Sequence, residues 1–275
     1  MPEAGSELTS MRSPRVKAAR RLAKRAFRQR DRLFLAEGPQ AVGEALASGA
    51  AVTELFVTAA ASARHAPLVA AAEQAGAAVR PVSGEVMAAL AQTATPQGLL
   101  AICEFVDVPL SEVISSTPRL VVVLAHVRDP GNAGTVLRTA DAAGAQAVIF
   151  TDASVDPYNG KCVRASAGSL FHLPVVAGAR LEAAAHSLRG AGMRILAADG
   201  HGRRSLDDAI AAGTLRSPTA WLFGNEAWGL PGELLSMADD SVAVPIYGRA
   251  ESLNLATAAA VCLYASARAQ RVPAP

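Results

Sequence analysis

The sequence has few aromatic residues, few cysteines and no long apolar segment. Aromatic residues make up 4% and charged residues 18% of the 275 positions, but 51% are hydrophobic, which excludes the polar composition of disordered chains. Cys103, Cys162 and Cys262 are odd in number and widely spaced, which is typical of reduced thiols and excludes a disulfide framework. Apolar runs fall well short of the roughly 18 residues of a membrane span. We therefore expect a folded cytoplasmic protein without a membrane segment.

Several signatures of nucleotide, hydrolase and metal sites are also missing. There is no G-x-x-x-x-G-K-[ST] phosphate loop and no G-x-G-x-x-G between a strand and a helix, so neither triphosphate nor nicotinamide dinucleotide binding is supported. A G-x-S-x-G elbow is absent as well. The five histidines lack the spacing and the acidic or cysteine neighbours of a metal-ligand set. The sequence thus predicts chemistry without a bound metal.

Positive charge is concentrated in residues 1–32, although the net charge of the chain is only +2. This segment holds 10 Lys or Arg and 3 Asp or Glu, which leaves 16 basic and 21 acidic residues of the chain's 26 and 24 for the remainder. Small apolar residues recur every three or four positions over 12–32, which predicts one cationic amphipathic helix. They are Val16, Ala19, Leu22 and Ala26.

We expect this basic arm to contact nucleic acid. A merely solvated helix and an organellar targeting segment are the alternatives. The candidate RNA-binding side chains are Arg15, Lys17, Arg20, Arg21, Lys24, Arg25 and Arg28.

Residues 33–106 alternate short apolar runs with helical patterns, which predicts a small α/β domain. The expected strands are 33–36, 55–57, 79–82 and 99–102, and the expected helices are 40–47 and 67–74. Residues 107–118 contain two prolines and three serines without periodicity, so we interpret them as a linker.

Residues 119–275 open with a β-branched run at 120–124, of the kind found in strands buried on both faces of a parallel sheet. Further strands are expected at 147–151, 194–198, 220–223 and 241–244, which indicates a doubly wound α/β sheet. The last helix, about residues 253–270, is apolar on several sides. We expect it to be buried against the sheet, a partner subunit, or both.

Three polar segments follow predicted strands, where the loops of a parallel sheet converge on a ligand crevice. They are the Asp-Pro-Gly-Asn-Ala-Gly run at 129–134 with Arg138 beyond it, the Gly-Asn-Glu run within 223–231, and residues 244–254 before the final helix. Each also has a structural explanation. Asn132 would cap a helix and Arg138 would pair with Asp141, and Ser252 or Asn254 would cap the final helix. Gly224 and Gly229 would permit close backbone approach.

Together the three segments resemble, in order and spacing, the motifs of the SpoU (TrmH) family of RNA ribose 2′-O-methyltransferases. The resemblance is carried by Asn132-x-Gly134-x-x-x-Arg138 with Ala143-Gly144, by Gly224-Asn-Glu226, and by Pro245 followed by Glu251-Ser-Leu-Asn254. It covers the whole second half of the chain. The first half resembles the ribosomal-protein-L30e-like substrate-binding domain of many members, including the thiostrepton-resistance rRNA methyltransferases. The sequence departs from the family motifs at two places. Val244-Pro-Ile246 stands where Ile-Pro-Met is usual, and Ala227-Trp228 follows Glu226 where a small or basic residue is more typical.

The resemblance implies an α/β SPOUT fold, in which a parallel sheet with a trefoil knot follows an L30e-like α/β substrate-binding domain. The expected divisions are an arm at 1–32, a substrate-binding domain at 33–106, a linker at 107–118 and a methyltransferase domain at 119–275. It also implies a homodimer through the methyltransferase domain, with the final helix at the interface. The implied cofactor is S-adenosylmethionine, with no metal. Candidate cofactor-binding residues are Ala198, Phe223, Gly224, Asn225, Val244, Ile246, Ser252 and Leu253.

By the same resemblance Arg138 is the catalytic residue, with Asn132, Glu226, Ser252 and Asn254 around it. A guanidinium stays protonated at working pH, so we expect Arg138 to hold a phosphate and stabilise the developing alkoxide. The expected function is methylation of a ribose 2′-hydroxyl. We expect 23S rRNA to be the substrate, because an L30e-like domain is itself an rRNA-binding type. The alternatives are a tRNA substrate, or a non-catalytic RNA-binding or ribosome-assembly factor.

Overall fold

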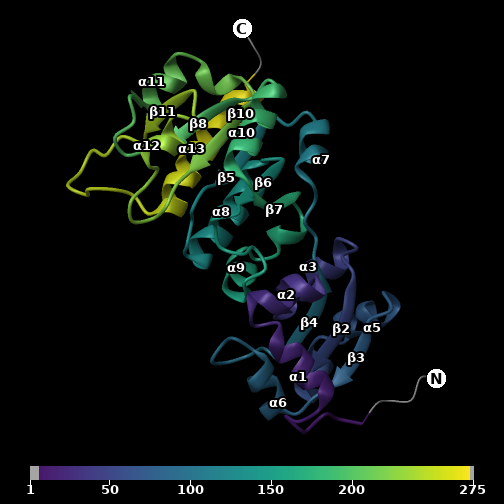
Figure 1. Cartoon of the computed structure of the whole chain (residues 1–275). Helices are drawn as coiled ribbons and strands as arrows, with labels where there is room; N and C mark the ends of the chain where they lie inside the picture. Colours follow the sequence, from purple (N-terminus) through teal and green to yellow (C-terminus); the bar gives the residue numbers. More distant parts are fainter. Residues whose placement is uncertain (1–5, 273–275) are drawn as a thin grey trace. The chain divides into compact units, whose positions relative to one another are not determined.

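The computed structural model describes residues 6–272 and contains two compact units (Figure 1). The first unit comprises the chain up to Val106 together with Tyr158–Phe171, and the second comprises Asp107–Pro157 and the chain from His172 onward. The first five residues of the predicted basic arm and the last three of the chain lie outside the described residues. Each unit has its own sheet and its own core, so each is described by itself.

A four-stranded sheet in the order β1-β4-β2-β3 forms the centre of the first unit. β4 is antiparallel to β1 and β2, whereas β3 is parallel to β2. The strands are β1 Leu33–Glu37, β2 Val52–Val57, β3 Ala78–Pro81 and β4 Leu99–Glu104. The helices are α1 Pro14–Arg21, α2 Arg25–Asp31, α3 Pro39–Ala47, α4 Ala59–Arg64, α5 Ala66–Gln74 and α6 Gly84–Leu90. The four predicted strands and two predicted helices are confirmed.

The prediction of one helix over 12–32 is wrong, because the chain turns between α1 and α2. The buried Arg28 guanidinium donates hydrogen bonds to the main-chain oxygens of Leu22 (2.8 Å) and Ala23 (2.9 Å). These carbonyls follow the last turn of α1, where helices leave acceptors unpaired. A charged side chain therefore closes the turn that the apolar periodicity did not reveal.

The predicted apolar stripe is buried for three of its four members. Val16, Ala19 and Leu22 pack in the core of the first unit, among side chains of β2, β4 and α6, whereas Ala26 is exposed. The described part of the basic segment is thus packed onto the four-stranded sheet, and removing it would remove part of the core.

A segment between the second unit's strands β6 and β7 completes the first unit. It contains α9 Gly160–Ala165 and the 3-10 turn η1 Ser169–Phe171. The ring of Tyr158 stacks on Phe105 with centroids 3.8 Å apart and lies 4.8 Å from Phe34. Arg164 donates to the carboxylate of Glu37 (3.2 Å), whose side chain is only 7% exposed. The chain consequently passes between the units three times.

The second unit is built on seven parallel strands in the order β7-β6-β5-β10-β8-β11-β9. These are β5 Leu120–Leu124, β6 Ala147–Thr151, β7 Val175–Ala179, β8 Arg194–Ala198, β9 Arg204–Ser205, β10 Thr219–Phe223 and β11 Asp240–Ala243. The helices are α7 Leu110–Ser115, α8 Pro130–Ala143, α10 Leu181–Gly190, α11 Leu206–Ala211, η2 Thr214–Arg216, α12 Gly232–Leu235 and α13 Leu255–Arg271. The predicted parallel α/β sheet and its five predicted strands are confirmed.

Two strands and one helix of the second unit were not expected. β9 has two residues, and β7 is buried only over its first two, so neither forms a buried apolar run. Residues 107–118 are not a structureless linker, because they contain α7, and its Val113 is buried in the second core.

The last helix, α13, buries one face against α8 and the sheet, as expected. Within this packing the indole nitrogen of Trp221 on β10 donates to the hydroxyl of Ser266 (2.8 Å). The other side of α13 leaves Val261 and Tyr264 exposed.

Candidate functional site

Four neighbouring strands of the second unit, β5, β10, β8 and β11, end at one edge of the sheet. Because these strands are parallel, the loops that follow them meet at that edge. The catalytic and cofactor candidates other than Arg138 lie in these loops, at the last residues of the strands, or in the first turn of α8. The edge is therefore where the sequence motifs come together.

The carboxylate of Glu226 joins the loop after β10 to the loop after β5. It accepts hydrogen bonds from the main-chain N–H groups of Arg128 (3.1 Å) and Asp129 (2.9 Å), and from the side-chain amide of Asn132 (3.3 Å). Such charge-assisted bonds are stronger than bonds between neutral groups. Glu226 thus fixes the position at which α8 begins.

Asn132 also contacts the third motif. Its side-chain oxygen accepts a hydrogen bond from the amide of Asn254 (3.0 Å). The oxygen of Asn254 in turn accepts from the N–H groups of Ala256 (2.9 Å) and Thr257 (3.4 Å), at the start of α13. Glu226, Asn132 and Asn254 consequently form a continuous chain of hydrogen bonds across the three motifs.

The predicted helix caps are right for Asn254 and wrong for Asn132. Asp129 caps α8 instead, because its carboxylate accepts the main-chain N–H of Asn132 (2.7 Å) and Pro130 occupies the first helical position. Sequence reasoning missed Asp129 although Asp-Pro is a signal for a helix start. The side chain of Asn132 is thereby left for Glu226 and Asn254.

A tight turn at 225–229 shapes the loop after β10. Asn225 and Gly229 exchange two main-chain hydrogen bonds of 2.9 Å, and the Asn225 side chain donates to the carbonyl of His126 (2.9 Å). A Cβ atom on Gly224 would lie 2.4 Å from the main-chain oxygen of Gly229. The expected close backbone approach at Gly224 is confirmed, since only glycine fits there.

Arg138 lies on the exposed face of α8. The predicted alternative, an ion pair with Asp141, is wrong: Asp141 contacts His172 instead (2.8 Å). Within residues 6–272, the Arg138 guanidinium has no hydrogen bond or ion pair. It is a fixed positive charge that remains available to a ligand.

The loop after β11 offers unpaired main-chain groups and apolar side chains. Over the described residues, the N–H and C=O groups of residues 244–253 have no hydrogen-bond partner within the protein. Ile246 and Leu253 are exposed, as is Ser252. The Tyr247 hydroxyl donates to Asp207 (2.8 Å), and this hydrogen bond, with the carboxylate charge, raises the pKa of Tyr247. A loop of this composition can bind a ligand through both its backbone and its apolar surface.

The remaining cofactor candidates lie on the adjacent strand ends. Ala198 is the last residue of β8, Phe223 is the buried last residue of β10, and Val244 directly follows β11. With Gly224 and Asn225, they line one edge over three neighbouring strands.

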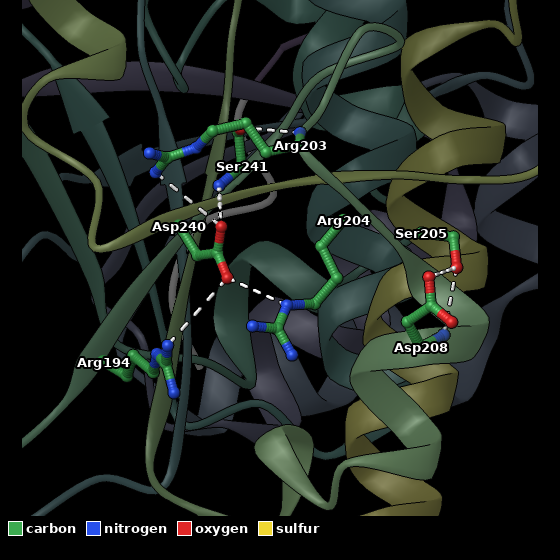
Figure 2. A network of polar contacts seen from close by, with 7 residues as sticks. All are labelled: Arg194, Arg203, Arg204, Ser205, Asp208, Asp240 and Ser241. Carbon is green, nitrogen blue, oxygen red and sulfur yellow. Dashed lines mark hydrogen bonds and ion pairs between the residues drawn. The ribbon is translucent and has the colours of Figure 1, made fainter.

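A charged cluster ties the edge strand β9 to β11 and β8. Figure 2 shows the carboxylate of Asp240 directed toward three arginines. The oxygen–nitrogen distances are 3.0 Å to Arg204, 3.7 Å to Arg203 and 3.9 Å to Arg194. Arg203 also donates its main-chain N–H to Ser241 (3.0 Å). This cluster holds the end of the 199–203 loop, and its members were not predicted because they are scattered from 194 to 241.

The candidate RNA-binding residues differ in their surroundings. The prediction that Arg28 binds RNA is wrong, because its buried guanidinium bonds to the backbone and is not available to phosphate. Arg15 pairs with Glu54 (2.9 Å), and Arg21 lies over the ring of Phe27 (4.2 Å). Among these candidates, four are exposed and have no hydrogen bond or ion pair within residues 6–272: Lys17, Arg20, Lys24 and Arg25.

None of the three cysteines forms a disulfide, and all three are buried. Burial raises the pKa of the Cys103 and Cys262 thiols to about 12. In the part of the chain that the structure describes, no three His, Cys, Asp or Glu residues are grouped to hold a metal ion. None of the described helices has the length and apolar character needed to cross a membrane.

Comparison with known families gives matches to both parts of the chain. The SpoU rRNA Methylase family matches residues 119–264, and the MRM3-like substrate binding domain matches residues 13–101. The fold is that of RNA methyltransferases with a parallel α/β sheet and a separate substrate-binding domain. The chain belongs to the SpoU rRNA methylase family.

Individual relatives resemble the chain over most of its length. It is 34% identical over 259 residues to the 23S rRNA (guanosine(2553)-2′-O)-methyltransferase RlmP of Bacillus subtilis, covering 94% of this chain and 98% of the relative. The AdoMet-bound rRNA methyltransferase from Sinorhizobium meliloti is similar in structure, with a TM-score of 0.82, 34% identity and coverage of 95% and 97%. The SpoU methyltransferase AviRb from Streptomyces viridochromogenes, in complex with AdoMet, gives a TM-score of 0.79, 27% identity and coverage of 93% and 98%.

Proposed function

We propose that this protein transfers a methyl group from S-adenosylmethionine to a ribose 2′-hydroxyl of 23S rRNA. The observation that carries the proposal is the hydrogen-bonded chain of Glu226, Asn132 and Asn254, which assembles all three family motifs beside the helix that bears Arg138. Named relatives of similar length act on 23S rRNA, and similar solved structures contain AdoMet.

The residues at the strand ends suit this cofactor. S-adenosylmethionine combines an apolar adenine with polar ribose and amino-acid groups, and the 244–253 loop combines exposed Ile246 and Leu253 with unpaired main-chain donors and acceptors. When bound, the cofactor supplies an electrophilic methyl group on a sulfonium sulfur. Gly224 and Val244 would bind it from the neighbouring strand ends, and Ser252 and Leu253 from the loop before α13.

Arg138 would act on the RNA rather than on the cofactor. In the transfer, the ribose 2′-oxygen would take the methyl group, the cofactor would leave as a neutral thioether, and the hydroxyl proton would pass to solvent water. Arg138 stays protonated, so its guanidinium would bind the neighbouring phosphate and stabilise the negative charge that develops on the oxygen. Glu226, Asn132 and Asn254 hold the surrounding loops in position.

We also propose that the cationic face of α1 and α2 binds RNA phosphates. Lys17, Arg20, Lys24 and Arg25 are exposed and have no acidic partner among residues 6–272, so their charge is available to phosphate. A 23S rRNA substrate implies action in the cytoplasm, and cysteines that form no disulfide are typical of that reducing compartment.

The homodimer implied by family resemblance is a further part of this proposal. α13 exposes Val261 and Tyr264, at 39% and 54%, on the side away from its own unit's core. Apolar helix faces of this kind are covered in stable dimers. Light scattering on the purified protein should give twice the chain mass, and Tyr264→Glu should give a monomer; a wild-type monomer contradicts this part.

The test of the proposed function compares rRNA and tRNA from cells with and without the gene. Mapping of 2′-O-methyl groups should show one site in 23S rRNA that disappears on deletion and returns with the wild-type gene. Loss of a tRNA site instead would make tRNA the substrate. An unchanged methylation map in both RNAs would favour a non-catalytic RNA-binding factor.

A further inference from the structure

The first unit contains a cavity of about 250 Å³, bordered by the end of β2, the beginning of β4 and helices α4 and α6. Its lining includes Thr58, Arg64, Met87, Pro96, Gln97 and Gly98. We propose that this cavity binds a single unpaired nucleobase of the RNA substrate. This inference rests on the proposed function, since it assumes that the chain acts on RNA.

The cavity has an apolar wall and a polar rim. Pro96 presents a partly exposed apolar ring against which a base can pack, whereas Met87 is only 1% exposed and contributes buried apolar lining. Arg64 and Gln97 provide a guanidinium and a carboxamide. Within residues 6–272, neither of these polar groups has a hydrogen bond or an ion pair. The rim therefore carries hydrogen-bonding groups whose partners must come from water or from a ligand.

The backbone around the cavity is closely packed. Gly98 has a φ of +83°, and a Cβ atom there would lie 2.5 Å from the Thr58 hydroxyl oxygen and 2.7 Å from the Ala61 Cβ. Gly38 has a φ of +93°, and a Cβ atom there would lie 2.8 Å from the side-chain oxygen of Gln97. The Gln97 carboxamide thus lies over the backbone of Gly38, which has no side chain. Of these two glycines, Gly98 lines the cavity, and its positive φ and close neighbours exclude a side chain there.

Size and chemistry together favour one nucleobase. Pockets for drug-sized ligands are about 300–1,000 Å³, so a cavity of about 250 Å³ suits a smaller planar group. A carboxamide offers a donor beside an acceptor, which matches the edge of a base, and a guanidinium offers paired donors. Proteins recognise RNA sequence mainly through unstacked bases of loops and bulges, whose edges are free to pair in this way. A base within a continuous duplex cannot enter.

The first test is ultraviolet cross-linking of the full-length protein to a 23S rRNA transcript, followed by mass spectrometry of the cross-linked peptides. Cross-links within residues 58–64 or 87–98 are the expected result. Cross-links confined to other segments, the cationic face of α1 and α2 included, overturn the proposal. This readout needs no methyl transfer, so it remains decisive if the chain proves to lack activity.

The second test uses substitutions on the rim. Gln97→Ala should raise KM for the 23S rRNA transcript about tenfold, because the alanine side chain cannot hydrogen-bond to a base edge, and should leave KM for S-adenosylmethionine unchanged. Gln97→Glu keeps the shape but removes the amide donors, and should have a similar effect. Gln74→Ala, at an exposed glutamine on α5, is the matched control and should behave as wild type.

RNA binding separates this proposal from the proposed function. In a binding assay, wild-type protein should prefer a hairpin with an unpaired loop over a duplex of equal length, and Gln97→Ala should lose that preference while keeping its duplex affinity. A Gln97→Ala protein with wild-type KM and unchanged hairpin preference overturns the base pocket. Absence of methyl transfer by the wild-type protein overturns the proposed function alone.

Discussion

At the residue scale, Arg138 differs in its surroundings from Glu226, Asn132 and Asn254. Glu226, Asn132 and Asn254 are bonded to one another or to main-chain groups, which fixes the loops. The Arg138 guanidinium has no hydrogen bond or ion pair with any residue of 6–272. The exposed guanidinium is therefore available to a substrate, which fits the role proposed for Arg138.

We predict that Arg138→Ala lowers methyl transfer by at least about 100-fold, since one preorganised electrostatic group is commonly worth that much. Affinity for S-adenosylmethionine, measured by calorimetry, should change by less than about threefold because Arg138 does not belong to the cofactor loops. Arg138→Lys keeps the charge but loses the planar fork and should restore little activity. Turnover by Arg138→Ala within about tenfold of wild type would refute this role.

At the residue scale, the sequence predicted which side chains gather at the site but not every contact among them. Asn132, Glu226 and Asn254 were expected together because each follows a parallel strand. The exchange of roles between Asp129 and Asn132 was not expected. Either side chain can cap a helix, and only the position of Glu226 determines which of them is needed elsewhere.

At the scale of elements, the short strand β9 depends on charge as well as on backbone pairing. Asp240 is 8% exposed and lies among three arginines that are between 36% and 75% exposed. A two-residue strand has few main-chain hydrogen bonds. The carboxylate therefore supplies much of what holds β9 and the 199–203 loop beside β11 and β8.

Asp240→Ala should lower the free energy of unfolding by about 2 kcal/mol in a denaturant titration, below the 3–5 kcal/mol typical of a fully buried pair because the arginines are partly exposed. It should also weaken S-adenosylmethionine binding, since the 199–203 loop follows Ala198. Arg203→Ala is the matched control, because this outermost arginine, 75% exposed, should cost less than about 0.5 kcal/mol. Equal effects of the two substitutions would show that the cluster is not centred on Asp240.

The α1–α2 segment combines a buried stripe with an exposed cationic face, so deletion is a poor test of RNA binding. Replacing Lys17, Arg20, Lys24 and Arg25 by glutamine keeps Val16, Ala19 and Leu22 in the core. The variant should bind RNA more weakly, and its salt slope should fall by about 0.7 for each single-strand phosphate that it no longer neutralises. Filter binding over a salt series measures this. An unchanged slope would mean that the face does not contact RNA.

At the scale of the whole molecule, the two units share one chain in an interleaved way. The strands, the sheet type and the final helix could be predicted, because apolar runs and hydrophobic periodicity are local features of the sequence. The place of Tyr158–Phe171 does not, because its packing on Phe34, Phe105 and Glu37 joins residues more than fifty positions apart. The trefoil knot implied by family resemblance also depends on how distant parts of the chain are arranged, and it stays a prediction.

We predict that a fragment of residues 1–106 alone is unstable. Without Tyr158 and Phe171 the ring of Phe34 loses apolar cover, and without Arg164 the buried Glu37 carboxylate loses its ion pair. Its thermal unfolding should start well below that of the full chain, and a version carrying 158–171 through a flexible linker should regain cooperative unfolding. If the plain fragment melts as the full chain does, the segment is not part of this unit's core.

The central prediction concerns the atom of the RNA that receives the methyl group. Purified protein, a 23S rRNA transcript and S-adenosylmethionine with a deuterated methyl group should be incubated, and the RNA digested to nucleosides for mass spectrometry. We predict the label on the ribose of one nucleotide, and at least about 100-fold slower labelling with Arg138→Ala. A label on a base, or ribose labelling by Arg138→Ala within about tenfold of the wild-type rate, would contradict this mechanism.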